Sequence, residues 1–395
     1  MNETAVTPPH GSSARAVFSG KQRDFFRLVR RGALFELITA GIYRFWLATD
    51  MRRALWSDTS VAGDAAEYTG TAKELLLGFL FALAVLVPIY LVYFLIGVEL
   101  ERARAFASIP LFLFFFAFAQ FAIFRARRYR ATRTVWRGVR FWMSGSGWAY
   151  SWRACLWDLL TLITVGLALP WREVALERYK MRHLHYGDLP GRFEAAGWDL
   201  FNRGFGLWLL CLCFVVLFGV VSHFLPGMSA LFALVFLIGG PFVYSAFKTI
   251  VWRWWIAGIR IGEVRFDSDL RSLTGLYWAT IGWFTLIIVV DITLVILVAA
   301  VTIMLFIGHF AAAELAQFAR QHSYLLFGAN LVNYLFIALC ANVVMRVYLV
   351  RGVWARVVAS TTVHHLELAE NVSARGDLVS ALGEGFADGL DVVGF

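Results

Sequence analysis

The decapeptide LITAGIYRFW at residues 37–46 recurs as LITVGLALPW at residues 162–171, with five of the ten positions identical. The two copies lie 125 residues apart, and similar segments follow each of them: VAGDAAEY at 61–68 and HYGDLPGRF at 185–193. Internal similarity at a nearly constant offset predicts a duplicated structural unit. In a very apolar chain it predicts a membrane fold built from repeats.

The composition supports a membrane location. Of the 395 residues, 60% are hydrophobic and only 16% are charged, whereas a soluble domain has about 25% charged residues. The net charge of +9 does not indicate a nucleic-acid partner, because the arginines cluster beside apolar segments. We therefore expect membrane lipid as a partner and no nucleic acid. The sequence names neither a small-molecule substrate nor an oligomeric state.

Six segments are long and apolar enough to span a bilayer, which requires about 20 mostly apolar residues. They are 75–98, 105–124, 205–225, 228–247, 276–307 and 324–345. Two further apolar segments, 33–48 and 154–171, are shorter and carry charge at Glu36, Arg44 and Asp158. These two segments contain the repeated decapeptide.

Basic residues predict the orientation, because cytoplasmic loops are enriched in Lys and Arg. Segments 125–153, 172–203 and 248–275 are rich in them, and Arg346, Arg351 and Arg356 follow the last span. The turns at 99–104, at Pro226-Gly227 and at 308–323 are poor in them. The first group is predicted to be cytoplasmic and the second extracytoplasmic, with both termini in the cytoplasm.

The basic flanks raise a conflict for 33–48 and 154–171, because both ends of each segment are predicted to be cytoplasmic. One full span cannot have both ends on one side of a membrane. We interpret the two segments as re-entrant or interfacial helices. The alternative is eight full spans with an imperfect charge bias.

A glycine–aromatic pattern recurs between the membrane segments. Its forms are VAGDAAEYTGTAKEL at 61–75, RGVRFWMSGSGWAYSW at 137–152, YGDLPGRFEAAGWDL at 186–200 and AGIRIGEVRFDSDL at 257–270. A half-copy, VFSGKQRDFF, occupies 17–26, and a weaker copy follows Arg351-Gly352. The pattern predicts short extended segments with glycine turns. Since isolated hairpins are marginally stable, we expect the copies to pair into a small cytoplasmic cap.

The predicted fold class is an all-α polytopic membrane protein with internal repeats. It has six full spans, two short re-entrant or interfacial helices and short cytoplasmic β-like elements. The predicted organisation is a flexible segment 1–16, a membrane domain 17–371 and a flexible tail 372–395. Within the membrane domain, 17–150 and 151–275 are the duplicated parts, and 276–371 follows them.

The order of these motifs resembles the YjgN-like family, a group of bacterial inner-membrane proteins classed as a domain of unknown function. The resemblance rests on FSG at 18–20, LITAGIYRFW, VAGDAAEYTGTAKELLLGF at 61–79 and RYRATRTVWRGVRFWMSGSGWAY at 128–150 before LITVGLALPW. It covers roughly 17–360. It implies a multi-pass protein of the bacterial inner membrane and brings no activity. The family pattern leads us to expect a third box near the last span, but ALCANVVMRVY at 338–348 does not match it.

No catalytic motif is legible. The chain has no Walker A loop, HExxH or Rossmann fingerprint and no G-x-S-x-G elbow, so we expect no cofactor and no enzyme. His364 and His365 with Glu367 could suggest a metal cluster. We interpret them as the solvated surface of a polar tail and predict no metal site.

Three sets of residues are candidates for function. Ionisable groups at membrane depth are costly and often functional, so Asp291 in the middle of 276–307 is the first, with Asn330, Asn333 and Asn342 as its expected partners. The second is the repeat motif itself, with Gly41 and Gly166 allowing close helix approach or a break. The motif residues are Thr39, Gly41, Trp46, Thr164, Gly166 and Trp171. The third comprises the candidate contacts to lipid headgroups, Arg137, Arg140, Trp142, Trp252 and Trp254.

Two functions fit these patterns. Repeats, interrupted helices and a midplane acid favour a transporter or channel for a small solute or ion. The Arg- and Trp-rich cytoplasmic face favours the alternative, a non-catalytic membrane scaffold or anionic-lipid-binding protein.

Overall fold

Ten short strands close into an antiparallel barrel in the order β1-β10-β9-β8-β7-β6-β5-β4-β3-β2. The computed structural model describes residues 13–99, 104–306 and 323–376. The strands are β1 (Ser13–Phe18), β2 (Thr59–Val61), β3 (Asp64–Tyr68), β4 (Thr134–Trp136), β5 (Val139–Met143), β6 (Leu184–Tyr186), β7 (Leu189–Phe193), β8 (Ile259–Ile261), β9 (Val264–Ser268) and β10 (Thr361–His364). Closure leaves no edge strand exposed to other chains.

Four hairpins with two-residue turns supply eight of these strands. The turns Ala62-Gly63 and Arg137-Gly138 have positive φ at both positions, as a type I′ turn requires. Gly187 and Gly262 supply a positive φ at the first turn position of the other two hairpins. The last two strands, β1 and β10, come from opposite ends of the chain and pair with Ala14 opposite Val363.

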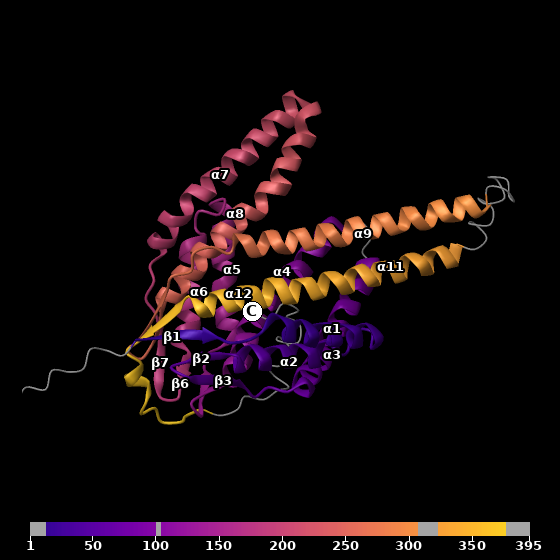
Figure 1. Cartoon of the computed structure of the whole chain (residues 1–395). Coiled ribbons are helices and arrows are strands. Elements are labelled where there is room, and N and C mark those ends of the chain that lie inside the picture. The colour runs from indigo at the N-terminus through magenta and orange to yellow at the C-terminus, as the bar shows by residue number, and fades with distance from the viewer. Residues whose placement is uncertain (1–12, 100–103, 307–322, 377–395) are drawn as a thin grey trace, which may run out of the picture.

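In the described chain, five helical hairpins leave the barrel and return to it, in the connections β1–β2, β3–β4, β5–β6, β7–β8 and β9–β10. Three of them are long: α3 (Ala72–Glu99) with α4 (Arg104–Thr132), α7 (Gly197–Phe224) with α8 (Ser229–Gly258), and α9 (Thr274–Phe306) with α11 (Ser323–Val344). The last continues through a π-helical turn η3 (Met345–Val350) into α12 (Arg351–Ala359). Figure 1 shows α7 and α8 diverging from α9 and α11, with the barrel strands gathered at the opposite end.

Within the described residues, six helices are long and apolar enough to cross a membrane, as the sequence predicted. These candidate spans are Ala72–Ile96, Ile109–Thr132, Gly197–Phe224, Pro226–Gly258, Thr274–Val298 and Phe327–Ala359. At most 22% of the residues in their most apolar stretches are buried within the chain. Their apolar side chains therefore face outward, as expected of surfaces that contact lipid tails.

The two decapeptides lie in the two short helical hairpins. The first is α1 (Gln22–Ile38) with α2 (Arg44–Ser57), and the second is α5 (Gly147–Ile163) with α6 (Leu169–Arg182). At 1.5 Å per residue, helices of 14 to 17 residues extend about 21 to 26 Å. This is short of the roughly 30 Å of a hydrocarbon core, and none of the four is among the candidate spans in the described chain.

Two predictions need correction. The description all-α was wrong, because the β-like elements form a closed barrel of ten strands, which requires pairing between segments hundreds of residues apart. The assignment of His364 to a polar tail was also wrong. His364 belongs to β10, which pairs with both β1 and β9, so this segment completes the ring.

Three of the four strand pairs begin two or three residues earlier than the glycine–aromatic pattern indicated. Hairpin β4–β5 ends at Met143, whereas the predicted element extended to residue 152; the later residues start helix α5. Most of the predicted tail 372–395 lies outside the described residues. Its first part lies against the barrel, where the Ser373 N–H donates a hydrogen bond to Asp188 Oδ1 at 3.2 Å.

Candidate apolar ligand site

The barrel lines a partly open apolar cavity of about 360 Å³. Alternation along the strands produces its lining, since successive side chains point to opposite faces. In β9, Val264 and Phe266 line the cavity while Arg265 and Asp267 are exposed. The lining also includes Trp56, Thr59, Val61, Ala66, Thr134, Trp136, Phe141, Tyr186, Ile261, Trp354, Val363, Leu366 and Ala369. A volume of this size lies within the range of small-molecule sites.

The polar groups of the lining bond to one another or to the backbone. The Trp56 indole N–H donates to Thr134 Oγ1 at 3.0 Å, and the Trp354 indole N–H donates to Thr59 Oγ1 at 2.9 Å. The Tyr186 hydroxyl donates to the Trp136 carbonyl at 2.9 Å. Burial raises the pKa of Tyr186 to about 12, so the phenol stays neutral. Because these groups are already hydrogen-bonded within the protein, a ligand need not supply hydrogen-bond partners for them. The cavity therefore suits an apolar molecule.

The two ends of the cavity are covered differently. At the end nearer the helices, the rings of Trp56 and Trp354 stack with centroids 4.7 Å apart. At the far end, where the hairpin turns lie, the short helix η4 (Leu366–Ala369) covers the barrel. Leu366 and Ala369 pack there against Tyr186, Val264 and Val363.

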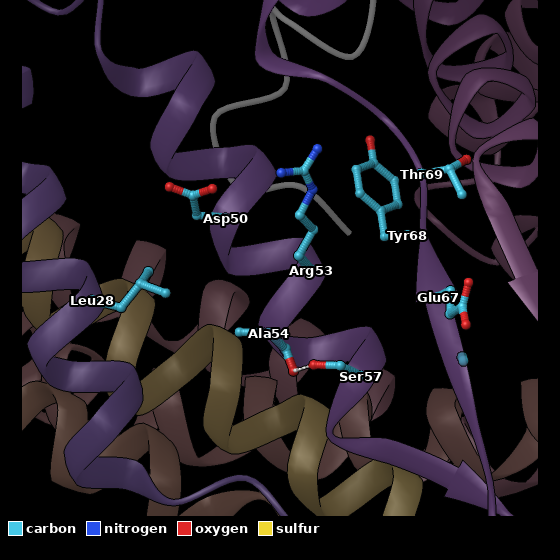
Figure 2. A pocket seen from close by; sticks show the side chains of 9 residues that line it. Leu28, Asp50, Arg53, Ala54, Ser57, Glu67, Tyr68 and Thr69 are labelled. Carbon is cyan, nitrogen blue, oxygen red and sulfur yellow. Dashed lines mark hydrogen bonds between the residues drawn. The ribbon is translucent and has the colours of Figure 1, made fainter.

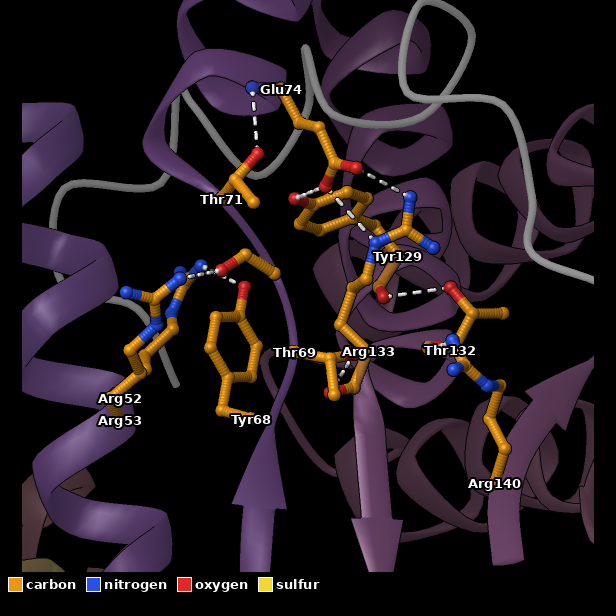
Figure 3. A network of polar contacts seen from close by, with 11 residues as sticks. Arg52, Arg53, Tyr68, Thr69, Thr71, Glu74, Tyr129, Thr132, Arg133 and Arg140 are labelled. Atoms are coloured by element: carbon orange, nitrogen blue, oxygen red, sulfur yellow. Dashed lines mark hydrogen bonds and ion pairs between the residues drawn. The ribbon is translucent and has the colours of Figure 1, made fainter.

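A layer of paired charges lies between the barrel and the long helices. Arg133 is buried and donates from Nε to Glu74 Oε2 at 3.0 Å, and the Tyr129 hydroxyl donates to the same carboxylate at 2.7 Å. Arg52 donates to the Tyr68 hydroxyl at 3.3 Å. Figure 3 shows these groups converging from α2, β3, α3 and α4. The network ties the base of the hairpin α3–α4 to the barrel.

A second buried cluster joins α4 to α6. Arg127 donates from Nη1 to Glu177 Oε2 at 3.0 Å, and Lys180 forms an ion pair with the same carboxylate. Desolvation opposes ionisation of Glu177, but the charges of Arg127 and Lys180 outweigh it and lower its pKa to about 2. Desolvation lowers the pKa of Lys180, against the attraction of Glu177. Because ionised glutamate holds both cations, we interpret the cluster as a structural clamp.

An open groove of about 520 Å³ lies between α1, α2 and β3. Figure 2 shows Asp50 and Arg53 facing it from α2, opposite Tyr68 and Thr69. Burial raises the pKa of Asp50, while the charge of Arg53 opposes the shift. Arg53 already donates to the Gly70 carbonyl at 2.9 Å. The groove is wide and exposed, and it lacks the enclosure of the barrel cavity.

The predicted intramembrane residues are only partly brought together. Asn333 of α11 donates from Nδ2 to Asp291 Oδ2 of α9 at 3.4 Å, and both side chains are half-buried. Asn330 lies on an exposed part of α11. Asn342 is half-buried nearer the barrel, and its Oδ1 has no hydrogen-bond partner among the described residues.

The repeat-motif residues lie at two breaks with the same geometry. Gly41 has φ +89° and Gly166 has φ +86°, each preceded by a residue with positive φ. Thr39 Oγ1 accepts from the Tyr43 N–H at 2.9 Å, and Thr164 Oγ1 accepts from the Ala168 N–H at 3.1 Å. Trp46 stacks on Tyr43 at 6.1 Å, whereas Trp171 meets Trp198 edge to face at 5.3 Å.

The predicted headgroup contacts are scattered over the molecule. Arg137 lies at the turn β4–β5 and pairs with Asp64, while Arg140 donates to the Thr132 carbonyl at 2.9 Å. Trp142 stacks on His185 on the outside of the barrel, with centroids 4.1 Å apart. Trp254 is only 3% exposed and donates to the Ala196 carbonyl. Trp252 is half-buried at the end of α8.

Sequence reasoning missed the cavity. The signal was the period-two alternation in VRFDS (264–268) and VRFWM (139–143), where apolar residues alternate with charged or outward-facing ones. The segments are too short to predict which strands are neighbours. No group of three or more metal-ligating side chains occurs within the described ranges, and His364 instead contacts Asp267 at 3.1 Å.

Comparison with known families gives one match. Residues 13–388 match the family described as bacterial protein of unknown function (DUF898). The chain belongs to this family. The match extends from the first barrel strand to beyond the last. The barrel and all six candidate spans of this DUF898 protein therefore lie within the matched residues. No curated protein and no solved structure matches the chain.

Proposed function

We propose that this DUF898 protein is a non-catalytic membrane protein that binds an apolar, lipid-like molecule inside its barrel. The observation that carries the proposal is the apolar, partly open cavity of about 360 Å³ inside the barrel, whose polar groups are satisfied within the protein. Apolar cavities of this kind stay dry and bind apolar molecules. The six candidate spans hold the barrel next to a reservoir of such molecules.

A pair of matched variants tests the proposal. Ala66 lines the cavity, whereas its neighbour Ala65 is exposed on the outside of the barrel. Purified protein in detergent is titrated with a fluorescent naphthylamine dye. We expect Ala66→Phe, which fills the cavity, to abolish saturable binding and Ala65→Phe to retain it. Equal binding by both variants would exclude the cavity as the site.

We propose that the protein lies in the bacterial inner membrane with the barrel and both termini in the cytoplasm. The basic segments 125–153, 172–203 and 248–275 adjoin the barrel, and cytoplasmic loops are enriched in such residues. Pairing of β1 with β10 puts both ends of the described chain on the barrel side. Labelling of a Ser57→Cys variant from one side or the other, in a background without native cysteines, tests this orientation. Labelling only from the periplasm would refute it.

We further propose that α1–α2 and α5–α6 are duplicated hairpins that enter the bilayer part-way. Their tips carry very exposed apolar side chains, with Ile38 77% and Leu162 76% exposed. Backbone polar groups at membrane depth need internal partners. In the described turns the N–H groups of 39–44 and 164–169 all have them. The similarity to the YjgN-like group rests in part on the same two motifs.

Transport is the second candidate, and one observation favours it. The contact between Asp291 and Asn333 places a carboxylate between two candidate spans, where ionisable groups often serve ion or proton pathways. In that role Asp291 binds a proton or cation. Asp291→Asn preserves the hydrogen-bonding shape and removes titration. A pH-dependent flux into vesicles that the variant retains unchanged would exclude the role.

Of the headgroup candidates, Trp252 beside Arg253 is the one we propose at the lipid interface.

A further inference from the structure

The far end of the barrel is tightly held. Leu366 and Ala369 of η4 are each only 6% exposed. The neighbouring hairpin turns are linked by the ion pair between Arg137 and Asp64. Beyond η4 the chain continues across this end, where the Ser373 N–H bonds to Asp188. Opening this end would break several of these contacts together.

The end nearer the helices is closed by two side chains. Trp56 at the end of α2 and Trp354 of α12 cover it, and each indole makes one hydrogen bond to a threonine hydroxyl. Both rings are only half-buried. Rotating either ring breaks its hydrogen bond to threonine and disturbs its ring contacts, which for Trp56 include Tyr68 at 5.6 Å. It requires no displacement of the backbone, whereas opening the far end requires η4 to move.

A packed apolar cluster connects this end with the candidate spans. Trp56 and Trp354 pack against a buried cluster between α1, α2 and η3, formed by Phe25, Val29, Leu47, Met51, Leu55, Val347 and Val350. On its other side the cluster contacts Val343 in α11. The cavity is therefore continuous in apolar character with the helices that face lipid.

The helix beside this path is irregular. Residues 345–350 form a π-helical turn between α11 and α12. Such turns are rare and are concentrated at functional sites. This one lies one turn before Trp354 along the chain, so a local change in winding would move the ring that covers the cavity.

We propose that the barrel takes up the acyl chain of a membrane lipid, which enters from the bilayer past Trp56 and Trp354. The inference rests on the proposed binding function and adds the class and source of the ligand. The chain threads between α2 and α12 while the headgroup stays at the membrane surface. Nothing covalent happens to the lipid.

Photolabelling in vesicles tests the proposal. The full chain is reconstituted with a phospholipid that carries a diazirine at the end of one acyl chain, and labelled peptides are mapped by mass spectrometry. We expect adducts on cavity-lining residues such as Val61, Phe266 and Val363. Filling the cavity with Ala66→Phe should lower this labelling by at least about tenfold, equivalent to about 1.4 kcal/mol, and Ala65→Phe should leave it unchanged.

A second pair of variants tests the entry route and does not depend on the folding of Ala66→Phe. Thr59→Val with Thr134→Val removes both acceptors of the indole N–H groups. Labelling of the barrel interior should then be several times faster. Ser373→Pro removes the N–H that bonds to Asp188 at the far end and should leave the rate unchanged. Acceleration by the far-end variant alone would overturn the route.

The outcomes separate this inference from the proposed function. Labelling confined to the spans, with saturable dye binding in the barrel, would overturn uptake of bilayer chains and leave the binding function intact. Absence of both dye binding and interior labelling in the wild-type chain would overturn the proposed function and this inference together. Equal interior labelling in Ala66→Phe and Ala65→Phe would show that the adducts do not report cavity occupancy and would also overturn the inference.

Discussion

The hairpins α1–α2 and α5–α6 have the same break but are held by different charges. In the first, Glu36 of α1 accepts from Arg346 Nη1 of η3 at 2.8 Å. In the second, Asp158 of α5 pairs with Arg172 of α6 and accepts from Gln120 Nε2 of α4 at 3.0 Å. The backbone break needs only local residues, so it can recur wherever the motif recurs. The charged contacts depend on which helix lies alongside.

The two hairpins differ most in their second helices, α2 and α6. Position 52 in the first hairpin corresponds to position 177 in the second at the offset of 125 residues. Arg52 donates to a tyrosine hydroxyl, whereas Glu177 holds Arg127 and Lys180. The second hairpin is thus clamped to α4 by a buried carboxylate, whereas the corresponding position of the first hairpin carries a buried cation.

The largest expected effect comes from breaking this clamp. Glu177→Gln leaves Arg127 and Lys180 without a carboxylate in a buried site. Removing one partner of a buried ion pair costs about 3–5 kcal/mol, and we expect a correspondingly large fall in the melting temperature in detergent. The control is Asp269→Asn, which breaks the exposed pair with Arg15 and should cost less than about 1 kcal/mol. A similar small loss for both variants would contradict the clamp.

Protonation of Glu177 should also make the stability of the protein sensitive to acid. The pKa of Glu177 is about 2 in the folded protein, compared with its ordinary value of 4.5. A lowered pKa stabilises the fold above the ordinary value, and this stabilisation is lost as the pH falls from about 4.5 toward about 2. Melting of the wild type should therefore become more acid-sensitive in this window than melting of Glu177→Gln. Parallel curves for the two proteins would exclude the linkage.

Glycine substitutions test whether the two breaks are equivalent. Gly41 and Gly166 adopt positive φ, which costs about 1–2 kcal/mol for a residue with a side chain. Gly41→Ala and Gly166→Ala should each lower stability by about this amount. Gly206 lies within helix α7 with open space around it, so Gly206→Ala should be neutral or slightly stabilising. Unequal losses at 41 and 166 would show that one break carries additional strain.

The smallest effect concerns the threonines of the breaks. Thr39→Val and Thr164→Val each remove the acceptor for one backbone N–H, which should cost about 1 kcal/mol. Thr161 only donates back to the Trp157 carbonyl, and Thr161→Val should cost less. Thermal melts of the three variants compare them directly. A loss at Thr161 as large as at Thr164 would mean that the cap contributes nothing specific.

Local features of this protein were legible in the sequence. Run length and composition predicted six long apolar segments, and the described residues contain six candidate spans. The glycine turns predicted short hairpins, and Gly41 and Gly166 were expected at a close approach or a break. Each of these depends on residues within one turn or one helix, because backbone conformation and helix length are local properties.

The tertiary structure decided what the sequence could not. Strands β1 and β10 are each too short to be recognised alone, and they pair across almost the whole chain. Ring closure creates the cavity, turns His364 from a tail residue into part of a strand, and brings Trp56 against Trp354. The partners of Glu36, Asp158 and Glu177 likewise depend on which helices pack together. These contacts are non-local, so no pattern of spacing along the chain could specify them.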